Sequence, residues 1–143
     1  MRNRIRSLVP QLVLVLSLFA TANRADAQGT GILREVYEGI PGNSIAELTS
    51  APNFPALPNS TNLLTDFFEA PVNVLENYGQ RIRGYVLPPQ SGYYTFWIAT
   101  DDEGALYLSS DEEPGNKQQV ASVPGWSGSR EWTKYPEQQS AQI

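Results

Sequence analysis

The chain has 143 residues, with 10 Lys and Arg against 15 Asp and Glu, and it contains neither His nor Cys. That length suits one domain with a substantial core. The missing residue types exclude a disulfide framework, a thiol nucleophile and any His-based triad built from this chain alone, whereas the oxygen ligands that remain suit calcium or magnesium better than zinc.

The first 27 residues have the features of a secretory signal peptide. Three arginines within the first six residues precede an apolar run at 12–22, and Ala25-Asp26-Ala27 follows as a small-x-small cleavage pattern. We therefore expect cleavage after Ala27 and export to the periplasm, the cell surface or the medium. The apolar run is shorter than the ~20 residues that cross a bilayer, which favours a signal peptide over an anchor or a buried N-terminal helix.

Cleavage at this point would make the chain more acidic. It removes four arginines and Asp26, which leaves 6 basic and 14 acidic residues in 28–143 and a net charge of −8. Nucleic acids and anionic membranes are held by clustered Lys and Arg, and only Arg81 and Arg83 lie close together in the sequence. Neither is an expected partner, and no transmembrane span is expected after signal removal.

Short apolar runs separated by Gly and Pro predict an all-β domain in the remainder of the chain. The first strand is expected at 32–38. Ser44 and Glu47 have the capping-box spacing, which predicts one short helix at about 44–50. Three prolines then predict an extended connecting loop over 51–62, because proline cannot donate to a sheet ladder.

The signal for strands becomes stronger after this loop, and three are predicted: 64–68, 80–87 and 93–100. The last is richest in aromatic and β-branched residues. Its alternation puts Tyr94, Phe96 and Ile98 on the core face.

An acidic turn at 101–104 predicts that the strand at 93–100 forms a hairpin with residues 105–108. A second acidic turn at 111–116 leads to a strand at about 117–123. Residues 129–143 are expected to form a loop and the start of a final strand. Because an alternating pattern begins at 140 and stops at 143, we expect domain 28–143 to be truncated at its C-terminus.

Asp101 and Asp102 form the sharpest candidate site. Two adjacent carboxylates repel each other even in water, and a hard dication with several oxygen ligands would relieve that repulsion. Neighbouring side chains in a strand point to opposite faces, so chelation by both needs a turn or an unusual peptide geometry. The alternative is a solvated acidic turn.

Aromatic side chains are the second candidate feature. Amphipathic rings can stack on the apolar faces of sugars, and Trp126 is the best candidate because it lies in the Gly- and Ser-rich loop 122–129. The alternative is that these rings pack on the sheets. A glycosidase would need two carboxylates about 5–10 Å apart, and no such pair can be assigned from the sequence.

The run from Tyr78 to Leu108 resembles the PA14 domain. The residues that carry the resemblance are Tyr78-Gly79, Arg83-Gly84-Tyr85, Pro88-Pro89, Gly92-Tyr93-Tyr94-Thr95-Phe96, Thr100-Asp101-Asp102-Glu103-Gly104 and Leu106-Tyr107-Leu108. Weaker similarity extends over 31–143. The resemblance implies an antiparallel β-sandwich, or jelly-roll-like barrel, with one short helix.

The resemblance also implies a function. In the sugar-binding members of the family, the adjacent Asp pair at the position of Asp101 and Asp102 holds calcium through a cis peptide, and the calcium bridges to sugar hydroxyls. The family's second calcium loop lies beyond the strands present here, so no residue can be assigned to it. The leading hypothesis is an exported, non-catalytic module that binds a glycan or cell-surface polysaccharide with calcium as a possible cofactor.

Two alternatives stay open. The domain could be a structural or protein-interaction module that positions a neighbouring enzyme or partner without binding sugar. It could instead be part of a hydrolase, whose catalytic residues would lie in another domain of a longer gene product, since this one lacks a recognisable catalytic set.

Overall fold

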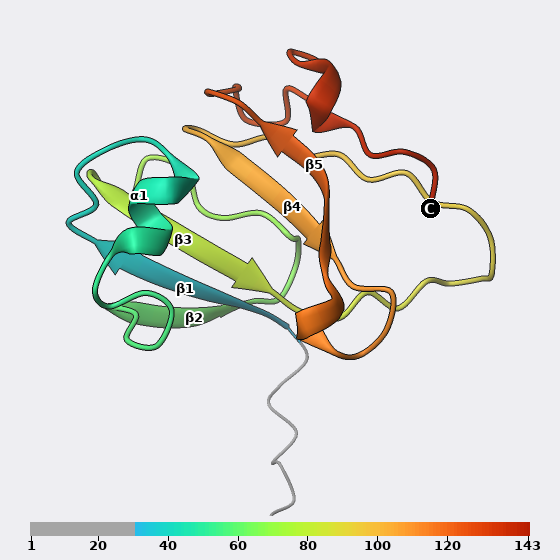
Figure 1. Cartoon of the computed structure of the whole chain (residues 1–143), viewed down its shortest axis with the longest axis horizontal. Coiled ribbons are helices and arrows are strands. Elements are labelled where there is room, and N and C mark those ends of the chain that lie inside the picture. Colours follow the sequence, from blue (N-terminus) through green and yellow to red (C-terminus); the bar gives the residue numbers. More distant parts are fainter. Residues whose placement is uncertain (1–30) are drawn as a thin grey trace, which may run out of the picture.

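The computed structural model describes residues 31–143, and Figure 1 shows their arrangement. The predicted signal peptide, 1–27, lies outside the described residues. Within them, five strands form two antiparallel sheets, accompanied by one short α-helix and two short 3-10 turns. The prediction of an all-β fold with one short helix is confirmed.

The first sheet is built around β1 (Ile32–Glu38), which lies between β2 (Ser60–Leu64) and β3 (Tyr78–Arg83). Both neighbours run antiparallel to β1, and the register places Glu35 opposite Arg81. The bounds predicted for β1 are confirmed. Because β1 is central, its side chains include the buried Val36 and the buried Glu35.

The prediction of a strand at 64–68 is wrong, and the proline-rich loop predicted over 51–62 ends sooner. The chain enters the sheet at Asn59, whose backbone N–H donates to the carbonyl of Val36 at 2.8 Å. Pairing with β1 begins at the next residue, so β2 is already complete at Leu64. The prolines exclude pairing only up to residue 58, where the last of them stands.

The third strand is also displaced from its predicted bounds of 80–87. The observed β3 begins two residues earlier and ends at Arg83, which lies opposite Leu33. Since β1 begins at Ile32, it offers no ladder partner for most of the predicted extension. Residues 84–87 are exposed.

Helix α1 (Ile45–Ser50) lies over the first sheet (Figure 1). Ser44 caps it as predicted: the Ser44 hydroxyl accepts from the backbone N–H of Glu47, and the Glu47 carboxylate accepts from the backbone N–H of Ser44. The helix inserts Leu48 into a core cluster with Tyr37 and Ile40. This cluster is the main apolar core of the described residues.

The second sheet consists of β4 (Gly104–Leu108) and β5 (Gln118–Val123), which pair antiparallel. The strands predicted at 105–108 and 117–123 are confirmed to within one residue. The acidic turn between them contains the 3-10 turn η1 (Pro114–Asn116). Ala121 and Val123 of β5 are buried.

The predicted hairpin between 93–100 and 105–108 is wrong. Segment 93–100 instead runs beside the C-terminal segment, which lies next to it in Figure 1. Tyr94 and Ile143 exchange backbone hydrogen bonds of 2.8 and 2.9 Å, and the N–H of Ile98 donates to Gln138 at 3.0 Å. Between these two described segments, one residue pair, Trp97 with Gln139, forms a β-bridge, and it is isolated from the two sheets. β4 pairs with β5 and not with residues 93–100.

The prediction that Tyr94, Phe96 and Ile98 form a core face is confirmed only in part. All three are half-buried, whereas Tyr93 and Trp97 on the other side are exposed. The alternation therefore sorted most of the side chains correctly. None of the three reaches full burial within residues 31–143.

Candidate functional site

Asp101 and Asp102 lie in the loop that joins segment 93–100 to β4. The prediction that they lie at the tip of a hairpin is wrong, because β4 pairs with β5 and not with segment 93–100. Both residues are exposed, and the peptide bond between them is cis.

Hydrogen bonds on both sides hold this loop in place. Before the pair, the Thr100 carbonyl accepts from the Ser127 N–H at 2.7 Å, and the Thr100 N–H donates to the Ser127 hydroxyl at 3.0 Å. After the pair, the N–H of Glu103 donates to the carbonyl of Asn43 at 3.2 Å. The Glu103 carboxylate accepts from the N–H of Ile45 at 2.8 Å. The acidic pair is thus fixed to the loop before α1 and to the loop after β5.

Gly104 also helps to hold this loop in place, because it is the residue at which the loop meets β4. It is buried, and a Cβ at this position would collide with the side chain of Thr100. Only a glycine lets the chain pass so close to a β-branched residue here. The approach of Gly104 to Thr100 therefore fixes the path of the two aspartates between them.

The electrostatics of the pair are unfavourable as they stand. Loss of surrounding water on folding, followed by the neighbouring Asp101 carboxylate, raises the pKa of Asp102 above its ordinary value. Within residues 31–143, neither aspartate takes part in an ion pair. No group of three or more potential metal-ligating side chains occurs in the described part of the chain. Two carboxylates offer hard oxygen ligands that fit calcium, whose remaining ligands would be carbonyls, water or ligand hydroxyls.

Trp126 stands next to Ser127, the residue that holds Thr100. The structure therefore brings the loop of Trp126 to the loop of the acidic pair, although 25 positions separate Trp126 from Asp101 in the sequence. The Trp126 side chain is 54% exposed, and the Lys134 ammonium lies over its ring at 3.0 Å from the centroid. A cation at this distance occupies one face of the ring, so the open surface of Trp126 is the rest of the indole.

The arrangement can be compared with known proteins. A sequence profile described as the PA14 domain matches residues 47–132. The chain belongs to the PA14 domain family. The match includes the cis-linked aspartates and Trp126, and it also includes Ser127 and Glu103, which hold the loop of the aspartates by hydrogen bonds.

This PA14 domain is similar to segments of much larger proteins. It is 33% identical over 109 residues to the mouse N-acetyl-beta-glucosaminyl-glycoprotein 4-beta-N-acetylgalactosaminyltransferase 1, a match that covers 73% of this chain and 10% of that protein. It is 30% identical over 97 residues to fibrocystin of Canis lupus familiaris, covering 68% of this chain and 2% of that protein. Mouse fibrocystin is 49% identical over 43 residues, which cover 30% of this chain and 1% of that protein. No solved structure matches the chain.

Two buried residues that hold segments of the PA14 domain together, Ser127 and Gln138, were not identified from the sequence. Ser127 lies in a Gly- and Ser-rich loop, where nothing local distinguishes it from its neighbours, yet it is 1% exposed. Gln138 is completely buried, and its side-chain amide donates to the carbonyls of Ile98 and Glu131 at 2.8 and 2.6 Å. Nothing local in the sequence distinguishes Gln138, because these two partners lie in other segments of the chain.

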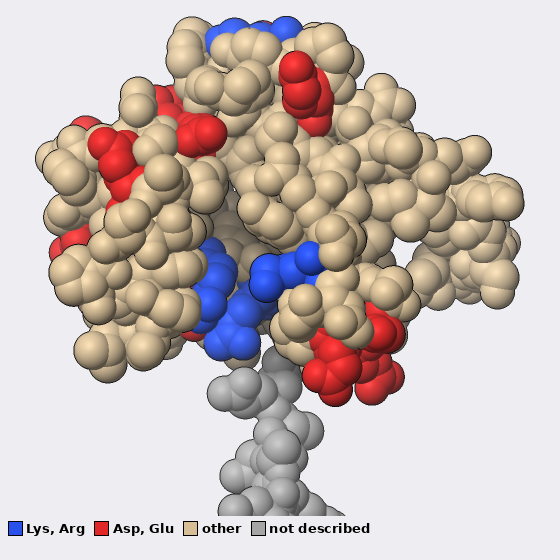
Figure 2. All heavy atoms as spheres, in the orientation of Figure 1, with Lys and Arg blue, Asp and Glu red and all other residues tan. Residues whose placement is uncertain are grey.

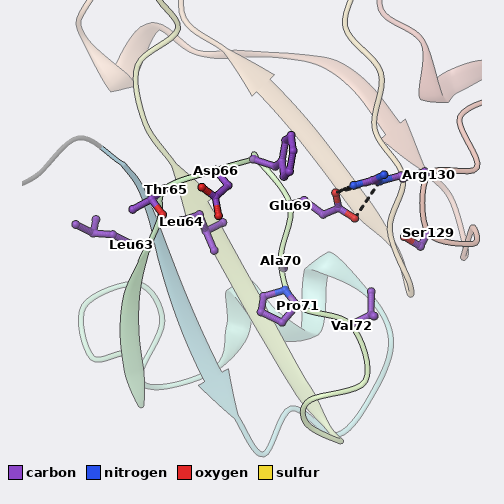
Figure 3. A pocket seen from close by; sticks show the side chains of 11 residues that line it. Leu63, Leu64, Thr65, Asp66, Glu69, Ala70, Pro71, Val72, Ser129 and Arg130 are labelled. Atoms are coloured by element: carbon purple, nitrogen blue, oxygen red, sulfur yellow. Dashed lines mark hydrogen bonds and ion pairs between the residues drawn. The ribbon is translucent and has the colours of Figure 1, made fainter.

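A separate pocket of about 480 Å³ lies between the segment after β2 and the loop at 129–130 (Figure 3). Arg130 and Glu69 form an ion pair of 2.7 Å on its wall, and the Arg130 guanidinium lies 5.9 Å from the centroid of the Phe67 ring. Phe67 is 68% exposed. This pocket contains neither the acidic pair nor Trp126, so it is a different surface of the PA14 domain.

Charge is unevenly spread over the face shown in Figure 2. Acidic side chains stand in several places around its edge, whereas a group of Lys and Arg side chains gathers at a hollow in the middle.

None of the helices within residues 31–143 has the length and hydropathy needed to cross a membrane.

Proposed function

We propose that this PA14 domain is a non-catalytic, exported module that binds a glycan through a calcium ion held by Asp101 and Asp102. The observation that carries the proposal is the pair of adjacent carboxylates itself. They are exposed, they have no cationic side chain paired with them within residues 31–143, and hydrogen bonds fix the loop on both sides. Calcium, when bound, supplies an electrophile for sugar hydroxyls, because its shell of 6–8 oxygens is flexible.

The residues of this chain do the positioning in that function. Ser127 and Glu103 hold the loop, the two aspartates supply the charged oxygens, and Trp126 offers the open part of its indole at the neighbouring loop. An indole beside a hydroxyl-binding ion suits a sugar, which has polar edges and apolar faces. The site is open, so single-site affinity is expected to be weak and multivalent presentation important.

The test is a calcium titration of the full chain by isothermal titration calorimetry, with Asp102→Asn as the variant. We expect heat of calcium binding for the wild type and its loss in Asp102→Asn. The matched control is Glu112→Gln, which removes a charge from the other acidic turn, where two glutamates are also adjacent. Equal calcium affinity in the wild type and in Asp102→Asn would contradict the proposal.

The export step has its own test. Expression of the full chain in a host with a signal peptidase should give a secreted product whose N-terminal residue is Gln28, read by Edman degradation or mass spectrometry. A product that keeps residues 1–27 would contradict cleavage after Ala27.

One observation favours a second candidate function, a protein-interaction module that binds no sugar. Phe67, Phe68 and Val72 are 68%, 57% and 63% exposed, and Phe67 and Val72 line the pocket of Figure 3. Clustered exposed apolar side chains commonly mark protein contacts. A glycan array probed with and without calcium separates the two functions, because this alternative requires no binding to any glycan under either condition.

A further inference from the structure

A second groove, of about 500 Å³, is lined by Thr95, Phe96, Trp97 and Trp132. Trp97 comes from the segment that leads to the acidic pair, and Trp132 comes from the loop after Trp126. Each indole is 45% exposed. Two half-exposed tryptophans thus face one open groove, from parts of the chain 35 positions apart in the sequence.

A buried amide holds the two tryptophan-bearing segments together. Gln138 is 0% exposed, and its Nε2 donates to the carbonyl of Ile98, directly after Trp97, and to the carbonyl of Glu131, directly before Trp132. Its Oε1 accepts from the backbone N–H of Tyr135 at 2.8 Å. All of its polar atoms are therefore satisfied by backbone, which fixes the two segments to each other. The groove is pre-formed by this contact.

The chemistry of the groove indicates what it takes. The described residues that line the groove are uncharged. They provide aromatic rings and the Thr95 hydroxyl. Branched aliphatic side chains, which a protein partner's apolar residues would pack against, are missing from this lining. Flat rings with an exposed polar rim suit the C–H faces of an uncharged sugar ring.

The distance to the acidic pair indicates the size of the ligand. Trp97 precedes Asp101 by four residues in the sequence, and four residues of extended backbone span about 13 Å. One sugar ring is too short to contact both places. An oligosaccharide can reach from the acidic pair to the groove.

We infer that the groove between Trp97 and Trp132 is a stacking subsite for a further, uncharged sugar residue of an oligosaccharide. This inference rests on the proposed function, because it assigns a second contact to the same ligand. It predicts that the domain prefers uncharged oligosaccharides to the corresponding monosaccharides.

The test uses the full chain labelled with 5-fluorotryptophan, which gives one ¹⁹F NMR resonance for each of its three tryptophans. Resonances are assigned with single Trp→Phe variants. The probes are cellohexaose and chitohexaose, together with glucose and N-acetylglucosamine, each in calcium and in EDTA. We expect at least one hexasaccharide to shift the resonances of both Trp97 and Trp132 in calcium at concentrations at which its monosaccharide does not.

Variants give the size of the effect. Trp132→Ala should weaken binding of that hexasaccharide by about three- to tenfold, the range expected for one aromatic contact. It should leave binding of the monosaccharide unchanged. Tyr107→Ala is the matched control, because Tyr107 is also 45% exposed but does not line the groove.

The outcomes separate the two proposals. If sugars bind in calcium through Asp102 while neither hexasaccharide moves the Trp97 and Trp132 resonances, the groove proposal is overturned and the proposed function stands. If the hexasaccharide shifts both resonances equally in calcium and in EDTA, the groove proposal is supported and the role of calcium is overturned. If no probe shifts any tryptophan resonance under either condition, the groove proposal is overturned.

Discussion

Glu35 has the most constrained environment of any carboxylate in the first sheet. It is 4% exposed and receives two hydrogen bonds from Arg81, of 2.6 and 2.9 Å, and two from Arg83, of 3.1 and 3.2 Å. The hydrogen bonds from Arg81 are the main reason that the pKa of Glu35 is lowered to about 2. Burial opposes this shift, and Arg83 adds to it. A buried carboxylate stays charged here because two guanidinium groups surround it.

Glu35→Gln should lower the free energy of unfolding by about 3 kcal/mol, since it leaves two arginines facing a neutral side chain in a half-buried place. Urea denaturation followed by circular dichroism measures this. Glu38→Gln is the control, because Glu38 ends the same strand, is exposed and forms no ion pair within the described residues. Equal losses in the two variants would contradict the role assigned to Glu35.

The same residue predicts an acid-labile fold. The pKa of Glu35 lies at about 2 in the folded chain, against an ordinary value of 4.5. Its contribution to stability is therefore fully present above pH 4.5 and is lost as the pH falls from 4.5 towards 2. Urea midpoints measured between pH 6 and pH 2.5 should fall steeply in the wild type and less steeply in Glu35→Gln.

Residues near each other in the sequence were the ones that sequence reasoning identified. Asp101 and Asp102 stand out because their repulsion is visible from adjacency alone. The triad of Glu35, Arg81 and Arg83 was missed because its members are 46 and 48 positions apart and meet only through the strand register. Buried Gln138 was missed for the same reason, since its partners lie in two other segments.

Helices and strands whose formation depends on residues nearby in the sequence were predicted correctly, whereas those that depend on distant residues were not. Helix α1 was predicted because the capping box is local, and β1 because its apolar run is bounded by turn residues. Segment 93–100 has the strongest strand composition in the chain, yet it joins neither sheet. Its pairing was decided by residues 138–143, far along the chain, and composition cannot show that.

One glycine links the second sheet to the acidic pair. Gly104→Ala should lower the free energy of unfolding by about 1–3 kcal/mol, because the new methyl group must displace the β-branched Thr100. It should also weaken calcium binding, since Thr100 leads directly into Asp101. Gly115→Ala is the control, because a Cβ there meets nothing within 4 Å. Thermal melts and calcium titrations of both variants measure the two effects. Equal stability and equal calcium affinity in the two variants would contradict the role assigned to Gly104.

At the scale of the whole molecule, net charge and exposed apolar surface have opposite effects on self-association. Several large apolar side chains are strongly exposed within residues 31–143, among them Leu87 at 89% and Tyr93 at 80%. The net charge of −5 at pH 7 opposes association of such surfaces. Neither the extent of this surface nor its position could be predicted from composition, since it depends on which strands pair.

This balance predicts self-association near the isoelectric point of about 4.6. Light scattering of the full chain should show its strongest association close to that pH and much less at pH 8. The chain without residues 1–27 is more acidic, so its maximum should lie at a lower pH. Scattering that does not vary with pH in either chain would contradict the prediction.

The Glu35 triad also selects one alignment of the central strands. A slip of β3 by a single residue along β1 would turn Arg81 and Arg83 to the opposite face of the sheet and leave the Glu35 carboxylate without either guanidinium. The mispaired sheet would then contain a buried, uncompensated negative charge. The three ionic side chains thus disfavour a one-residue shift of β3, and they act in the same direction as the apolar side chains of β3, which such a shift would also turn to the other face.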